Sequence, residues 1–136
     1  MSNVLIVCER SGDWAVAWRT AMASPGFDVT TTVVESRSLD ECRELLDEHP
    51  TALAVIELSR GNIEAVCSLL ASIERRWPRA VVVLVTDAEL RDETELLLRE
   101  HGAQHVMSSR YDLTGAIDIA RRHFRRATTA FMPASA

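Results

Sequence analysis

The stretch Thr51-Ala52-Leu53-Ala54-Val55-Ile56-Glu57-Leu58 decides the fold. It is short and apolar, and turn-forming residues bound it on both sides. An apolar run of this length is typical of a central parallel strand that is covered on both faces. In an open α/β sheet, sites are built in the crevice beyond the carboxyl ends of such strands. Glu57, near the end of this one, is therefore the first candidate for a functional residue.

Strand-like and helix-like segments alternate along the whole chain. The other predicted strands are Val4–Cys8, Phe27–Val34, Ala80–Val85 and Ala103–Met107. The predicted helices run from about Asp13 to Ala23, from the Ser38–Glu41 capping box to about His49, from Gly61-Asn62 to Trp77-Pro78, from about Glu89 to Glu100, and from Tyr111 or Asp112 to the arginines near 126. Right-handed crossovers then give an α/β fold with a doubly wound, parallel five-stranded sheet. The strand order that we expect for it is 2-1-3-4-5, one of the common orders of such sheets.

The composition is that of one ordinary globular domain. The chain has 136 residues, 47% of them hydrophobic, which suits a single core. No apolar run could span a bilayer and the start does not resemble a signal peptide, so we expect a cytoplasmic protein without a membrane role. Fifteen basic residues, all Arg, against 20 acidic ones give a net charge of −5, which disfavours nucleic-acid binding. Three cysteines without a Cys-x-x-Cys pair fit a reducing compartment.

Several motifs occur in a characteristic order. The first strand ends in Cys8-Glu9, the run Val83-Leu84-Val85 leads into Thr86-Asp87, and Gly102-Ala103 leads into Val106-Met107-Ser108-Ser109. With Glu57, this order and spacing resemble the receiver (CheY-like) domain of two-component response regulators, over about Val4 to Arg126. The resemblance implies a flavodoxin-like (βα)5 domain at residues 1–126. Residues 127–136 are small, polar and unpatterned, and we expect a flexible C-terminal tail.

The resemblance also assigns the positions of a phosphorylation site. In the family an Asp accepts the phosphoryl group, an acidic pair holds Mg²⁺, a Lys steadies the phosphate and a hydroxyl responds to it. Here Glu57 stands at the phosphoacceptor position, Cys8 and Glu9 at the acidic pair, Ser109 at the Lys and Thr86 at the hydroxyl. One extra methylene moves the nucleophilic oxygen by about an ångström, and such a misplacement can cost ~100-fold in rate. The chain is therefore similar to a degenerate pseudo-receiver.

Three roles for Glu57 remain open. It is a solvated polar group at a strand end, a fixed charge that imitates a phosphorylated Asp, or an altered phosphoacceptor. Glu9 and Glu57 together form a weak candidate site for Mg²⁺, provided that a carbonyl and waters complete the shell. Trp14, rather than Arg, stands six residues after Cys8, which argues against the Cys-x5-Arg chemistry of small tyrosine phosphatases. We expect no enzymatic activity and no tightly bound cofactor.

Three functions follow from these observations. The first is a signalling module that acts by protein–protein contact, with a homodimer through helix 4, strand 5 and helix 5 as one form of that contact. The second is a phosphorelay receiver with an altered Glu site. The third is a flavodoxin-like binder of a small ligand, with its cleft around Glu9, Thr86 and Ser109.

Overall fold

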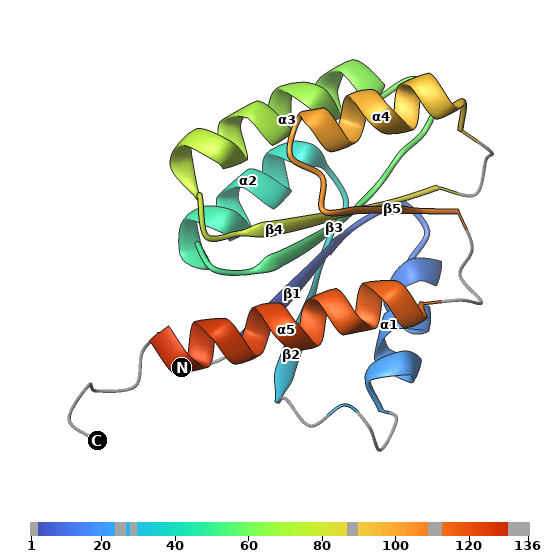
Figure 1. Ribbon diagram of the computed structural model, residues 1–136. Coiled ribbons are helices and arrows are strands. Elements are labelled where there is room, and N and C mark those ends of the chain that lie inside the picture. Colours follow the sequence, from blue (N-terminus) through green and yellow to red (C-terminus); the bar gives the residue numbers. More distant parts are fainter. Residues whose placement is uncertain (1–2, 24–26, 28–29, 87–89, 109–112, 131–136) are drawn as a thin grey trace.

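The computed structural model describes residues 3–23, 27, 30–86, 90–108 and 113–130. Strands and helices alternate along them (Figure 1). The strands are β1 (Asn3–Cys8), β2 (Thr31–Ser36), β3 (Leu53–Glu57), β4 (Val81–Val85) and β5 (His105–Met107). The helices are α1 (Asp13–Met22), α2 (Leu39–Glu48), α3 (Ile63–Arg76), α4 (Asp92–Glu100) and α5 (Thr114–Ala130). The strands form one parallel sheet of order β2-β1-β3-β4-β5, which confirms the predicted α/β fold.

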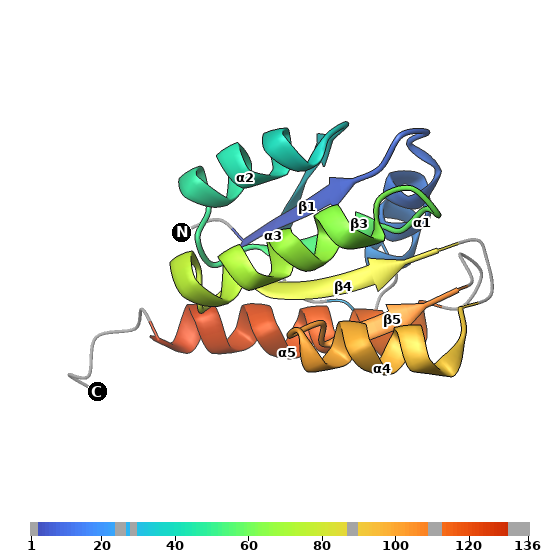
Figure 2. The same cartoon turned by 90° about the horizontal axis from the view of Figure 1, so that it is seen from above.

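Helices cover both faces of the sheet, and this explains why its central strands are apolar throughout (Figures 1 and 2). On one face, α2, α3 and α4 pack over side chains such as Ile6, Ile56 and Leu84. On the other face, α1 and α5 pack over the alternate side chains, among them Val7 and Val55. Each central strand therefore contributes to two cores, as period-two alternation requires.

The carboxyl ends of the strands lie together at one edge of the sheet. Cys8 pairs with both Ser36 of β2 and Ile56 of β3, and Glu57 pairs with Val85 of β4. The order of strands reverses between β1 and β3, because β1 is followed in sequence by β2 on one side and β3 lies on the other. This is the switch point where open α/β sheets form their sites.

Several element boundaries differ from the predicted ones; β2 begins at Thr31 rather than at Phe27, and β5 begins at His105 rather than at Ala103. Strand β2 ends at Ser36 rather than at Val34, because its polar end still pairs with β1 up to Cys8. Helix α4 begins at Asp92, after Arg91 in an extended conformation, whereas the predicted start at Glu89 lies outside the described residues. Helix α5 continues past residue 126 to Ala130, and residues 131–136 of the predicted tail also lie outside the described residues.

The amino terminus of α2 carries the predicted capping box. The Ser38 hydroxyl accepts a hydrogen bond from the Glu41 N–H at 3.1 Å. The Glu41 carboxylate in turn accepts from the N–H of Arg37 at 3.2 Å, one residue earlier than a standard capping box has it. Among the described residues, none of the helices has the length and apolar character needed to cross a bilayer.

Candidate functional site

A cleft of about 380 Å³ opens at the switch point, beside the carboxyl ends of β1 and β3 and the amino ends of α2 and α3. Cys8, Glu9 and Glu57, which were predicted as site residues, all line it. The remaining lining residues are mostly polar or charged: Arg10, Arg37, Ser38, Leu39, Asp40, Arg43, Ser59, Asn62 and Ala65. The topology thus brings three of the predicted positions to one place.

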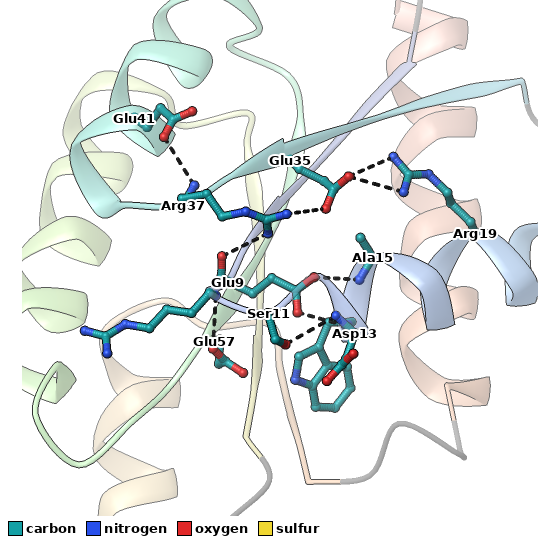
Figure 3. Close-up of polar contacts among 11 residues, drawn as sticks. Glu9, Ser11, Asp13, Ala15, Arg19, Glu35, Arg37, Glu41 and Glu57 are labelled. Atoms are coloured by element: carbon teal, nitrogen blue, oxygen red, sulfur yellow. Dashed lines mark hydrogen bonds and ion pairs between the residues drawn. The ribbon is translucent and has the colours of Figure 1, made fainter.

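Glu9 is buried, with 3% of its surface exposed, and its carboxylate caps helix α1 (Figure 3). One oxygen accepts the N–H of Trp14 at 2.8 Å and the other accepts the N–H of Ala15 at 2.7 Å. The first N–H groups of α1 depend on Glu9 for these hydrogen bonds, because Gly12, at the N-cap position, has no side chain that could accept them. A carboxylate at a helix amino terminus is favoured by both these hydrogen bonds and the helix dipole. Glu9 is therefore committed to the architecture of the β1–α1 loop.

Glu57 is half-buried at the last position of β3. One carboxylate oxygen accepts a long hydrogen bond, 3.4 Å, from the backbone N–H of Arg10 in the β1–α1 loop (Figure 3). Its backbone carbonyl accepts from the Asn62 side chain at 2.9 Å, and Asn62 Oδ1 accepts the N–H of Ser59 at 2.7 Å. The β3–α3 loop is thus fixed by Asn62, while the contact that the Glu57 carboxylate makes with the described residues is the long one to Arg10.

Arg37, which sequence reasoning missed, connects three elements around the cleft (Figure 3). Its guanidinium donates to the carbonyl of Glu9 at 3.2 Å and to the carboxylate of Glu35 at 3.0 Å. The same carboxylate accepts from Arg19 of α1 at 3.3 Å. The sequence could have pointed to Arg37, because parallel strands end at the same edge of a sheet and Arg37 directly follows β2. The prediction ended β2 at Val34, however, and so left Glu35 and Arg37 in a loop without an assigned role.

Cys8 is 5% exposed, and its thiol donates to the carbonyl of Ser38 at 3.4 Å. Cys42, in the first turn of α2, is near enough for a hydrogen bond from its side chain to be the largest influence on the pKa of Cys8. That hydrogen bond is the main reason why the pKa of the Cys8 thiol is lowered, although burial acts in the opposite direction. The same hydrogen bond, together with burial, raises the pKa of the Cys42 thiol.

Thr86, the predicted hydroxyl position, is not among the residues that line the cleft. Thr86 is buried just beyond β4, and its N–H bonds to the carbonyl of Met107 at 3.0 Å. Its neighbour Val85 pairs with Glu57, so the hydroxyl position is adjacent to the strand end but not among the residues that line the cleft. Ser109 lies outside the described residues.

The donor atoms at the cleft do not suit Mg²⁺, the ion that the receiver resemblance implies. Both carboxylate oxygens of Glu9 already accept backbone hydrogen bonds, and the neighbouring position offers the thiol of Cys8. Mg²⁺ requires near-octahedral oxygen ligands. No group of three or more His, Cys, Asp or Glu side chains that could hold a metal occurs among the residues described. Of the two predicted metal ligands, Glu57 is the one whose carboxylate makes no short hydrogen bond to any described residue.

Comparison with family models and with curated proteins gave no match for this chain. Solved structures do match it. A response regulator from Thermotoga maritima superimposes with a TM-score of 0.74 at 14% identity, covering 92% of this chain and 99% of that one. A CheY-like protein (tadZ) from Pseudomonas aeruginosa PAO1 has a TM-score of 0.67 at 21% identity, covering 89% and 94%.

A pilus assembly protein CpaE from Caulobacter crescentus CB15 is also similar, with a TM-score of 0.65 at 19% identity over 97% of this chain and 100% of that one. Identities this low carry the fold and no residue roles. The same fold thus occurs in proteins named response regulators and in proteins named for pilus assembly. This chain has the fold of CheY-like receiver domains.

Proposed function

We propose that this chain is a receiver-like signalling module that acts by protein–protein contact, without phosphoryl transfer by the usual Asp mechanism. The observation that carries this proposal is the position of Glu9. It is the one acidic residue left at the acidic-pair position, and its two carboxylate oxygens hold the amino terminus of α1. A carboxylate used in this way is a poor metal ligand, because binding the metal would compete with two short hydrogen bonds.

Glu57 supports the same proposal. Phosphoryl transfer depends on positioning and on charge neutralisation by a metal and a cation. At this site the nucleophile is one methylene longer, a thiol replaces one metal ligand, and the chain contains no Lys to steady a phosphate. The Glu57 carboxylate then supplies a constant negative charge near the position where a phosphoryl group would add one.

The proposal is tested with beryllofluoride and Mg²⁺, followed by amide chemical shifts of the ¹⁵N-labelled protein. We expect no saturable shift at Glu57, Arg10 or Thr86, and the same result for the Glu57→Ala variant. The Glu57→Asp variant is the matched comparison, because it restores the shorter nucleophile while leaving Cys8 and Glu9 unchanged. Saturable shifts in the wild-type protein that vanish in Glu57→Ala would overturn the proposal in favour of an altered phosphoacceptor.

The small-ligand alternative draws support from the size of the cleft, since ligand sites typically measure some 300–1,000 Å³. The residues that line the cleft, however, disfavour a small-ligand site. Ligand pockets are mostly apolar with a few polar groups, whereas this cleft is lined by three arginines and three carboxylates, several of them already paired with one another or with neighbouring side chains. Contact with another protein therefore remains the better supported function.

The proposed working surface is the α4–β5–α5 face, meaning the edge strand β5 with α4 on one side of the sheet and α5 on the other (Figure 2). Two large apolar side chains of α4, Leu96 and Leu97, are 59% and 43% exposed. The first turn of α4 is acidic, and α5 carries exposed arginines. A second copy of the chain would meet this surface with complementary charges.

A further inference from the structure

Two thiols that lie far apart in the sequence meet at the carboxyl end of β1. Cys8 ends β1 and Cys42 lies in the first turn of α2. The Cys8 thiol and the Cys42 N–H both donate to the carbonyl of Ser38, at 3.4 and 3.0 Å, so one acceptor atom fixes both residues. Both cysteines are free and belong to the same packed core between the sheet and α2.

The two sulfur atoms differ in access. Cys8 lines the 380 Å³ cleft, whereas Cys42 is fully buried behind it and is not among the residues that line the cleft. The third cysteine, Cys67, lies on α3 and is half-buried. A small oxidant that enters the cleft therefore reaches Cys8 first, with Cys42 directly behind as the partner.

We propose that Cys8 and Cys42 form a redox modification site, in which a hydroperoxide oxidises Cys8 and Cys42 then closes a reversible disulfide. In the first step the Cys8 sulfur attacks one oxygen of hydrogen peroxide, the O–O bond breaks, and Cys8 sulfenic acid and water form. In the second step the Cys42 sulfur attacks the sulfenic sulfur, the S–O bond breaks, and the disulfide forms with release of a second water. The two thiols lose two electrons, and the peroxide gains them.

The environment of the thiols suits this order of events. A thiolate is the nucleophile, and the hydrogen bond from Cys42 is the main cause that lowers the pKa of Cys8. A hydrogen bond from the Ser36 side chain also lowers the pKa of Cys8, whereas burial and nearby carboxylates oppose this effect. Glu41 and Glu57 raise the pKa of Cys8, and Arg10, Arg37 and Arg43 also line the cleft. Cys42 stays protonated until Cys8 is oxidised, because its hydrogen bond to Cys8 and its burial raise its pKa.

Closing the disulfide changes the cleft. The sulfur atoms must approach to about 2 Å, which draws the first turn of α2 toward β1. Oxidation also removes the S–H that binds the Ser38 carbonyl, and Ser38 both caps α2 and lines the cleft. The state of the thiols would thus be transmitted to the residues around Glu57. In a reducing compartment such a bond is transient, as expected of a redox sensor rather than of a structural disulfide.

The test uses the full chain, titrated with hydrogen peroxide under non-denaturing conditions and then alkylated without reduction. We expect the oxidised protein to take up one alkyl group, on Cys67, instead of three, peptide mapping to join Cys8 to Cys42 with the loss of two hydrogen atoms, and dithiothreitol to restore both thiols. Amide shifts of Ser36, Arg37 and Ser38 should change on oxidation and return on reduction.

Single-cysteine variants distinguish a specific disulfide between Cys8 and Cys42 from non-specific oxidation of all thiols. Cys67→Ser should form the same disulfide in the same yield, whereas Cys42→Ser should stop at a sulfenic acid on Cys8 that dimedone traps. Circular dichroism of each variant establishes that it is folded. A linkage through Cys67, dimers joined between chains, or over-oxidation of Cys8 without a disulfide in the wild-type protein would each overturn the proposal.

Discussion

At the scale of single residues, Glu9 shows how a position that resembles a catalytic one can become structural. Replacing Glu9 by Ala removes two charge-assisted hydrogen bonds from the amino terminus of α1 and leaves two buried N–H groups without a partner. Each such bond contributes roughly 1.5–3 kcal/mol, so we expect the free energy of unfolding to fall by about 3–5 kcal/mol. Urea denaturation measures this change.

The matched control for Glu9 is Glu64, an exposed acidic residue in the first turn of α3. Glu64→Ala should change the free energy of unfolding by less than about 1 kcal/mol, since it removes only an exposed interaction with the helix dipole. Glu9→Gln, which keeps one strong acceptor, should lie between the two. Equal effects of Glu9→Ala and Glu64→Ala would contradict the capping role of Glu9.

The lowered pKa of His123 makes the free energy of unfolding depend on pH. Burial lowers its pKa below the usual 6.5, and its Nε2 lies 2.7 Å from the carbonyl of Thr51. The unfolded chain therefore binds a proton more readily than the folded one. Stability is fully present above pH 6.5 and falls as the pH drops through 6.5 toward the lower pKa of the folded state. His123→Gln, which can still donate to Thr51, should flatten this slope in urea unfolding series between about pH 5 and 8; an unchanged slope would refute the assignment.

At the scale of elements, the β1–α1 connection depends on one glycine. Gly12 has φ +91°, a left-handed conformation that costs other residues roughly 1–2 kcal/mol. A Cβ there would meet Arg37 and Glu35 only at 3.5 and 3.6 Å, so the expected loss in Gly12→Ala comes from backbone strain and not from a clash. We expect thermal or urea unfolding to show a loss of about 1–2 kcal/mol.

Gly61, before α3, is the matched control for Gly12. A Cβ added at Gly61 would meet no atom within 4 Å, and the backbone there is not left-handed, so Gly61→Ala should be neutral or slightly stabilising. If Gly12→Ala is as well tolerated as Gly61→Ala, then the amino end of α1 adapts to a change of backbone at Gly12, and the connection does not depend on this glycine.

Sequence patterns predict an element well where burial alone decides it. The apolar runs at β1, β3 and β4 are covered on both faces, so their type and their central place follow from composition. The end of β2 was placed too early, because Glu35 and Ser36 are polar and only their pairing with β1 makes them a strand. The hydrogen bond between Cys8 and Cys42 was missed for the same reason, since it depends on how α2 packs across the sheet.

At the scale of the whole molecule, the sheet leaves β5 as an edge strand between α4 and α5. The parallel α/β fold followed from the alternation of elements and the handedness of crossovers, and the strand order was taken from the common orders of such sheets; the structure confirms both. The surface that contacts a partner depends instead on exposed side chains, and the hydrophobic periodicity of the sequence does not identify these. Leu96 and Leu97 adjoin the buried Leu98 in the sequence of α4, yet both of them are exposed.

This exposure predicts the oligomeric state. If the α4–β5–α5 face joins two copies, light scattering coupled to gel filtration should show a dimer that dissociates on dilution, and Leu96→Ser with Leu97→Ser should give a monomer at every concentration. Val16→Ser is the matched control, because Val16 is 62% exposed on α1, away from α4. It should leave the dimer intact.

Added salt should weaken the dimer if the acidic turn of α4 faces the arginines of the other copy's α5. A wild-type protein that stays monomeric at high concentration would exclude self-association and leave α4 as a surface for a different protein.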